Sequence, residues 1–167
     1  MDTINWKSVI KGNKELFSEI IFGVKDDAYR VAYSYLHDEH EAMDCVCNAI
    51  EKAYKNLKKI KEERFFKTWF IRLTINECKM YLRKKKRVIY MADDISNSED
   101  NYQDIEGKLD LKSILSKLPS QERTLLHMKY YLGYTFDDIS GITGMPEGTV
   151  KTKIYSSLKL MRDKFRI

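Results

Sequence analysis

The sequence predicts an all-α protein made of two small helical domains joined by a flexible acidic linker. Apolar residues recur every three or four positions through most of the 167-residue chain, which is the period of a helix with one buried face. The alternation of apolar and polar residues that indicates β-strands is scarce. Both prolines, Pro119 and Pro146, stand where a helix would begin, and that position tolerates a missing backbone N–H.

The distribution of charge supports the division into domains. The net charge of +5 is spread unevenly, with +6 in residues 1–87, −6 in residues 88–107 and +5 in residues 108–167. Two basic blocks around an acidic connector suggest two domains that each meet a polyanion, although a basic surface can also serve solubility alone. We therefore expect domains at residues 1–90 and 108–167, and a self-repelling linker at residues 91–107.

Several classes of protein are excluded by the composition. The start of the chain has no basic segment followed by an apolar run, so it does not resemble a secretory signal. The longest apolar runs are about five residues, whereas a membrane span needs about 20. Three cysteines without an export signal favour a reducing compartment. We expect a cytoplasmic protein that does not insert into a membrane.

The sequence also lacks the usual patterns of catalytic and metal sites. There is no phosphate-binding glycine loop, HExxH motif, CxxC pair or nucleophile–base pair, so we expect no catalytic residues, no cofactor and no enzymatic activity. His37, His40, Cys45 and Cys47 lie close together in the sequence, but a structural zinc site usually needs four well-spaced ligands. We interpret them as exposed polar residues and small core thiols, and expect no metal.

The first long helix is expected around residues 17–35, where apolar residues form one inward stripe. We expect a break near Gly23, with Asp26 or Asp27 capping the second part. The next helix is expected over residues 39–57. Its apolar stripe comprises Ala42, Val46, Ala49, Ile50, Ala53 and Leu57. Its opposite side is polar and carries Asp44, Asn48, Glu51 and Lys55. Taken alone, that side is an ordinary solvated surface.

The stretch FFKTWFIRLTINECKMYLRKKKR predicts a helix wedged between neighbours, because it is apolar on two flanks. Trp69 follows the spacing of the core rather than that of an exposed stacking platform. One polar ridge remains, at positions i, i+4, i+7 and i+11. It consists of Arg72, Asn76, Lys79 and Arg83. Five consecutive cations, residues 83–87, continue this ridge.

The C-terminal block predicts a helix-turn-helix. Ser120 is expected to cap a first helix, and Thr135 a short second helix in which Asp138 completes a capping box. Gly144 supplies the turn before a last helix, which starts after Pro146. The apolar stripe of this last helix comprises Val150, Ile154, Leu158, Met161 and Phe165.

A second face of the last helix is small and basic. It consists of Thr149, Thr152, Lys153 and Ser156, flanked by Lys151 and Lys159, with Gly148 beside it. Hydroxyls and lysines suit phosphate contacts and base edges in the DNA major groove, and a glycine lets the backbone come close to its partner. The alternative is a three-helix structural module that binds no DNA.

These residues carry a resemblance to a known family. The stretch LPSQERTLLHMKYYLGYTFDDISGITGMPEGTVKTKIYSSLKLMR resembles the C-terminal domain of bacterial extracytoplasmic-function (ECF) sigma factors, with its LP, ER, EIA-like and GTVK positions. Asp138, Ser140 and Gly141 depart from the EIA pattern. HEAMDCVCNAIEKAYKNL is similar to the polymerase-docking helix AEDLVQETFLKAY, and the wedged helix to FRAWLFRIARNLALDYLRRRRR.

The resemblance implies a sigma-70 family protein with a sigma-2-like helical bundle, a linker and a sigma-4-like helix-turn-helix. It implies that the last helix reads the −35 promoter element and that the ridge of Arg72, Asn76, Lys79 and Arg83 engages the −10 element and helps to melt it. The core RNA polymerase contact implied on the docking helix consists of Asp44, Cys47, Asn48 and Glu51. The implied partners are core RNA polymerase, promoter DNA and an anti-sigma factor, often anchored in the membrane, and the implied role is transcription initiation in a stress response.

Two other functions fit parts of the sequence. A helix-turn-helix regulator that binds DNA without polymerase would explain the C-terminal block alone. A helical protein-interaction module would use the basic faces to meet an acidic partner. Dependence on core polymerase distinguishes the sigma factor from both.

Overall fold

The computed structural model describes residues 5–92 and 111–165, and all regular elements in these ranges are helical. The first range contains α1 (Trp6–Ile10), α2 (Lys14–Leu36), α3 (Glu39–Asn56), the 3₁₀ turns η1 (Leu57–Lys59) and η2 (Glu63–Phe65), and α4 (Phe66–Ala92). The second contains α5 (Leu111–Ser116), α6 (Ser120–Leu126), the π-helical turn η3 (His127–Tyr131), α7 (Phe136–Thr143) and α8 (Glu147–Phe165). The predicted all-α class is confirmed. From residue 93 on, the predicted linker lies outside the described residues.

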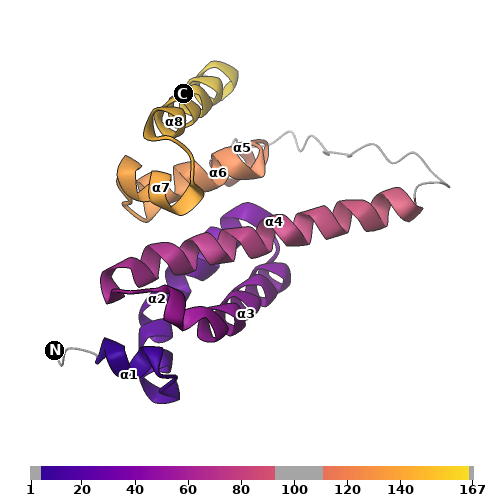
Figure 1. The fold of residues 1–167 in the computed structure, drawn as a ribbon. Helices are drawn as coiled ribbons and strands as arrows, with labels where there is room; N and C mark the ends of the chain where they lie inside the picture. Colours follow the sequence, from indigo (N-terminus) through magenta and orange to yellow (C-terminus); the bar gives the residue numbers. More distant parts are fainter. Residues whose placement is uncertain (1–4, 93–110, 166–167) are drawn as a thin grey trace.

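Helices α2, α3 and α4 pack into a bundle, with α1 at one end (Figure 1). The inward stripes predicted from the sequence supply its core, since Ala28, Val31, Ala42, Ala49 and Ala53 are fully buried. Small residues at these positions let the three helices approach closely.

The predicted break near Gly23 is wrong, because α2 is a single helix. Asn13 caps its start by accepting a hydrogen bond from the Leu16 backbone N–H at 3.0 Å. A glycine inside a helix costs about 1 kcal/mol, whereas burying a large aliphatic side chain contributes about 1.5–3 kcal/mol. Ile20, Ile21 and Val24 are all buried on the inward side of α2, so packing outweighs the propensity of Gly23.

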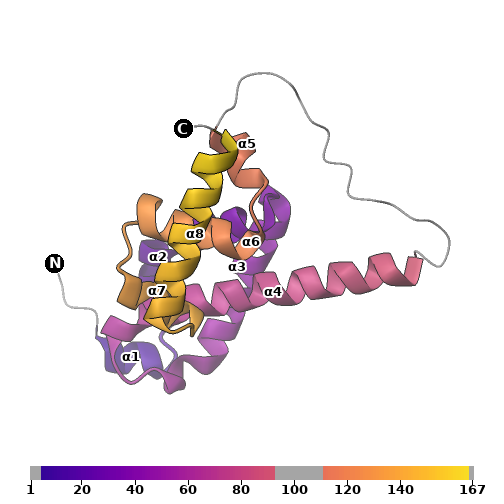
Figure 2. The same cartoon turned by 90° about the horizontal axis from the view of Figure 1, so that it is seen from above.

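Helix α4 is buried on two flanks, as predicted. Phe66, Phe70, Ile71, Ile75 and Cys78 are all buried. The Trp69 ring lies 5.9 Å from that of Phe66 and packs against the core. The 27 residues of α4 make a helix about 40 Å long, and its C-terminal part extends beyond the bundle (Figures 1 and 2). The exposed cations of residues 83–87 lie in the C-terminal half of α4, where the Lys85 ammonium still pairs with Glu41 of α3 at 2.7 Å.

The C-terminal range forms the predicted helix-turn-helix from α7 and α8. The capping box is present, because the Thr135 hydroxyl accepts from the Asp138 N–H at 3.0 Å and the Asp138 carboxylate accepts from the Thr135 N–H at 2.9 Å. Gly144 turns the chain with a positive φ of 74°. Ser120 was predicted to be an N-cap, but it is the first residue of α6, and Pro119 holds the cap position without a side-chain hydrogen bond.

The two ranges contact each other along two helix pairs. Helix α6 packs against α2, and α7 packs against the N-terminal half of α4 (Figure 2). Helix α8 lies on the side of α6 and α7 that faces away from the bundle (Figure 1). The predicted contact helix of the C-terminal domain is therefore on the outside of the molecule.

Candidate nucleic-acid interface

The predicted reading face of α8 is open to solvent. Its exposed members are Gly148, Thr149, Thr152, Ser156 and Lys159. The Thr152 hydroxyl donates to the Gly148 carbonyl at 2.9 Å, and the Ser156 hydroxyl donates to the Lys153 carbonyl at 3.0 Å. With their hydrogens used inside the helix, both oxygens retain lone pairs that can accept hydrogen bonds from base amino groups.

The three lysines of this face differ in their surroundings. Lys153 is half-buried and donates to Glu122 of α6 at 3.0 Å. Lys151 pairs with Glu147, and this hydrogen bond raises the pKa of Lys151. Lys159 is exposed, and no ion pair joins it to any residue that the structure describes. Lys159 is therefore the lysine that can reach a phosphate without first breaking an existing contact.

Tyr155 is a surface residue of α8 that the sequence did not single out. Its side chain is 56% exposed, and its ring lies 6.1 Å from that of Phe136 at the start of α7. The Lys151 ammonium lies 5.4 Å from the same Phe136 ring. Tyr155 lies four residues from both Lys151 and Lys159. This spacing could have placed it at the edge of the reading face from the sequence alone.

The polar ridge of α4 is present as predicted. Arg72, Asn76 and Arg83 are exposed, and Lys79 is half-buried. At the N-terminal end of this ridge, the Arg72 guanidinium lies close to the turn before α8. A β-carbon built at Gly144 would be 3.2 Å from the Arg72 Nη2. The ridge thus meets the C-terminal domain at one end and remains open at the other.

A partly buried ion pair fixes the helix that carries this ridge. The Glu77 carboxylate is 7% exposed and accepts a hydrogen bond from the Lys52 ammonium of α3 at 2.6 Å. Whereas Asn76 is exposed, the buried Glu77 side chain faces α3 and anchors α4 against it. The sequence gave no signal for this pair, since 25 residues separate its members.

The predicted polymerase-docking face of α3 is also exposed. All four members, Asp44, Cys47, Asn48 and Glu51, lie in solvent. Lys55 pairs with Glu51 one turn along the helix and lowers the pKa of Glu51. This face therefore presents carboxylates, an amide and a thiol, with the exposed Met43 side chain at its edge one turn before Cys47.

The neighbouring cysteine faces the opposite way. Cys45 is buried, and burial raises the pKa of its thiol. Cys45 and Cys47 therefore point to different sides of α3 and cannot share a small ligand set. Among the described residues, no group of three or more histidine, cysteine or acidic side chains is placed to hold a metal ion. The helices of residues 5–92 and 111–165 also include none with the length and apolarity of a bilayer span.

Comparison with known proteins gives consistent matches over both ranges. The family Sigma-70 region 2 matches residues 23–88 and the family Sigma-70, region 4 matches residues 108–161. RNA polymerase sigma factor SigV of Bacillus subtilis is 32% identical over 154 residues, which cover 89% of this chain and 90% of SigV. ECF RNA polymerase sigma factor SigW of the same species is 31% identical over 176 residues, which cover 96% of this chain and 94% of SigW.

Two solved structures share the fold. The sigma factor RpoE of Bartonella quintana, crystallised with the anti-sigma factor NepR, aligns with a TM-score of 0.73 at 21% identity over 90% of this chain and 97% of that one. CnrH, in complex with the cytosolic domain of CnrY, aligns with a TM-score of 0.68 at 16% identity over 96% of each chain.

Proposed function

The chain belongs to the ECF sigma factors of the sigma-70 family, and from this membership we propose that it directs core RNA polymerase to promoters through three separate surfaces. Residues 1–90 form the sigma-2-like domain, which binds core polymerase and the −10 element. Residues 91–107 connect it to the sigma-4-like domain of residues 108–167, which binds the −35 element. The two family matches, residues 23–88 and 108–161, fall inside these domains.

One observation carries this proposal. The polar faces of α3, α4 and α8 are solvent-exposed, while the opposite sides of the same helices build the cores. Each face is therefore available to a partner without any loss of internal packing. Two of the faces are cationic, which suits DNA, and the face of α3 is acidic and polar, which suits a basic protein surface.

The ridge of α4 fits a role in melting. Extracting a base from the duplex costs a few kcal/mol, and contacts to the single strand recover part of that cost through stacking and neutralisation of phosphates. Arg72, Lys79 and Arg83 supply the positive charge, and Asn76 supplies an amide that can hydrogen-bond a base edge. The cations at 83–87 extend the positive surface along α4, although Lys85 pairs with Glu41 of α3.

A protein of this kind has no catalytic step of its own, since polymerisation belongs to the core enzyme, and it acts in the cytoplasm, where the chromosome lies. We propose that an anti-sigma factor regulates it. The support comes from its structural neighbours, the sigma factor RpoE crystallised with the anti-sigma factor NepR and CnrH in complex with CnrY. One of these partners is represented by a cytosolic domain, and we propose a membrane-anchored anti-sigma factor here.

A reconstituted transcription assay tests the function. The purified chain is mixed with core polymerase of Bacillus subtilis and a pool of double-stranded templates of random upstream sequence, and the transcripts are sequenced. We expect transcripts that depend on the chain and start downstream of two enriched sequence elements. DNA binding without any dependence on polymerase would instead indicate a helix-turn-helix regulator. Absence of both DNA and polymerase binding would indicate a protein-interaction module.

A further inference from the structure

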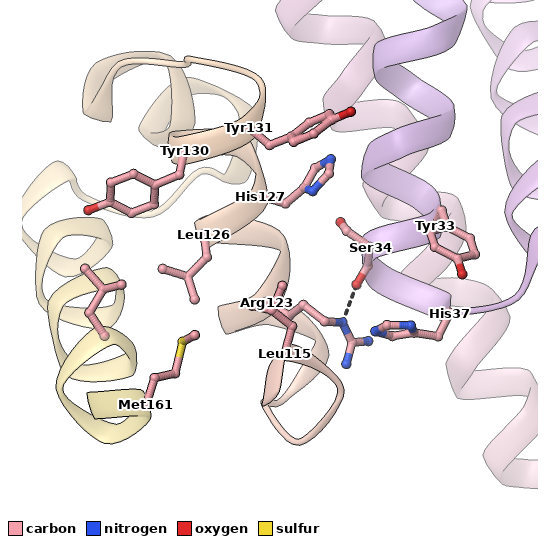
Figure 3. Close-up of a pocket in the computed structure, with 11 residues that line it drawn as sticks. Tyr33, Ser34, His37, Leu115, Arg123, Leu126, His127, Tyr130, Tyr131 and Met161 are labelled. Carbon is pink, nitrogen blue, oxygen red and sulfur yellow. Dashed lines mark hydrogen bonds between the residues drawn. The ribbon is translucent and has the colours of Figure 1, made fainter. Parts of the chain in front are cut away.

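Two polar contacts in the structure join helices through residues that lie far apart in the sequence. The first is made by Arg123 of α6, which is 8% exposed. Its Nε donates to the Ser34 carbonyl at 2.5 Å and its Nη2 to the Tyr35 carbonyl at 3.0 Å, both at the end of α2 (Figure 3). Its Nη1 donates to the Leu118 carbonyl in its own domain at 3.1 Å. This guanidinium is therefore shared between the domains, and its hydrogen bonds serve the fold.

The second contact joins the start of α3 to the C-terminal half of α4. The Glu41 side chain is 17% exposed, and its Oε1 accepts hydrogen bonds from the Tyr81 hydroxyl and from the Lys85 ammonium, each at 2.7 Å. The hydrogen bond to this carboxylate raises the pKa of Tyr81 to about 12, so Tyr81 is a donor at neutral pH. Glu41 lies in the first turn of α3, where the helix dipole favours a negative charge. One carboxylate therefore holds two side chains that lie one turn apart on α4.

This contact is made where α4 leaves the bundle. Past Lys85, the side chains of residues 86–89 are all exposed, including the apolar Val88 and Ile89 at 67% and 47%, and the end of the helix extends beyond the bundle (Figures 1 and 2). Isolated helices shorter than about 12 residues are only marginally stable in water. Like charges four residues apart, such as those of Arg83 and Arg87, repel each other. A segment of this kind needs an attachment to the bundle to stay helical.

The contact also sets which cations face away from α3. Successive residues of an α-helix are about 100° apart around its axis, so Lys85 lies about 200° from Arg83, the last member of the ridge. Lys86 and Arg87 lie only about 60° and 40° from Arg83. Among the described residues, no ion pair joins Arg83, Lys86 or Arg87 to another side chain. With Lys85 held against α3, these three cations are presented on the side of the ridge.

We propose that Glu41 is a positioning residue for the −10 surface, because its contact with α4 keeps the C-terminal half of that helix ordered and in one rotation. Arg83, Lys86 and Arg87 then meet the promoter phosphates as one continuation of the ridge, while Glu41 itself touches neither DNA nor polymerase. This inference rests on the proposed function and deepens it. A carboxylate that acted only through its charge would instead lower the positive potential and weaken DNA binding. The two roles predict effects of opposite sign when the charge is removed.

One variant and a matched control separate these roles. Glu41→Gln removes the charge and nearly preserves the size of the side chain. Glu39→Gln removes the same charge from the same first turn of α3. Glu39 is exposed, and no ion pair joins it to another described residue. Neither residue belongs to the proposed polymerase surface on α3, so a general electrostatic effect should be similar in both variants.

The salt dependence of promoter binding is the main measurement. Fluorescence anisotropy follows polymerase holoenzyme on a labelled duplex taken from the promoters enriched in the transcription assay. We expect Glu41→Gln to lower the slope of log affinity against log salt by about 0.9, the contribution of one phosphate contact, although this variant carries more positive charge. Glu39→Gln should leave the slope unchanged or slightly steeper. A slope that stays the same or steepens in Glu41→Gln would overturn the proposal, as would equal reductions in both variants.

Amide hydrogen exchange of the free chain tests the contact without polymerase or DNA. In Glu41→Gln, the amides of residues 86–89 should exchange about two- to fivefold faster, the factor that a partly exposed ion pair supports. The amide of the buried Ile75 should stay protected, and Glu39→Gln should match the unmodified chain. Unchanged exchange at residues 86–89, or lost protection throughout α4, would refute the positioning role. Faster exchange in a chain whose unmodified holoenzyme selects no promoter would show that the proposed function has failed, and the −10 role of Glu41 with it.

Discussion

Lysine contacts on α8 offer a quantitative test of the −35 surface. Each phosphate neutralised by a lysine contributes about 0.9 to the slope of log affinity against log salt. Lys159 is exposed and unpaired within the described residues, so Lys159→Ala should lower the slope by about 0.9. When the salt rises from 50 to 200 mM, the affinity of the variant should therefore fall about 3.5-fold less than that of the unmodified chain.

Lys153 is the matched comparison. Its ammonium is 3.0 Å from Glu122, with side-chain exposures of 33% and 20%, and a partly exposed pair of this kind is worth about 0.2–1 kcal/mol. A phosphate contact by Lys153 requires that pair to break, so Lys153→Ala should lower the slope by less than Lys159→Ala does. The sequence places both lysines at the reading face, and the Glu122 pair is the structural feature that distinguishes them.

The measurement uses fluorescence anisotropy of polymerase holoenzyme with a labelled duplex taken from the enriched promoters, at four salt concentrations. Thermal denaturation of both variants checks that neither change disturbs the fold. An unaltered slope for Lys159→Ala would remove this residue from the interface. Equal reductions for the two variants would show that the Glu122 pair does not restrain Lys153.

Three further predictions concern the rest of the molecule. Lys52→Ala leaves the 7% exposed Glu77 carboxylate without its partner. We expect the free energy of unfolding, measured by urea denaturation, to fall by about 1–3 kcal/mol. A loss below about 0.5 kcal/mol would contradict a structural role for the pair. Asn76→Ala should impair promoter melting more than recruitment of polymerase, and permanganate footprints identical to those of the unmodified chain would exclude it from the −10 contact. Burial, and secondarily the Arg30 charge, lowers the pKa of His127. The unfolded chain, in which histidine has a pKa of about 6.5, therefore binds more protons than the folded chain near and below this pH. As a result, the free energy of unfolding decreases as the pH is lowered. His127→Gln should therefore lose less stability than the unmodified chain between pH 7.5 and 5.5, and equal losses would be evidence against this assignment.

Features that depend on nearby residues could be predicted from the sequence. The capping box of Thr135 and Asp138 joins residues three apart, and its geometry follows from the helix itself. The inward stripes of α3, α4 and α8 follow from the helical period in the same way. The exposed polar faces could be predicted because they are what remains when these stripes are buried.

Features that join distant residues could not. Glu122 and Lys153 are 31 residues apart, and Arg123 and Ser34 are 89 apart, so neither contact produces a periodic pattern. The predicted break at Gly23 failed for a different reason. The low helix propensity of glycine was given more weight than the burial of the apolar residues around it. The exposed polar faces could therefore be predicted for α3, α4 and α8, while the ion pairs that distinguish the lysines within them became visible only in the assembled fold.

The shared guanidinium at the end of α2 also means that the halves of the chain do not fold with fully separate stabilities. A fragment that ends after α4 lacks Arg123, so the Ser34 and Tyr35 carbonyls would be left to water and the last turn of α2 would fray. Amide hydrogen exchange at this turn should accordingly be faster in the fragment than in the intact protein. The same few amides would then report, in solution, how often the halves of the full chain come apart.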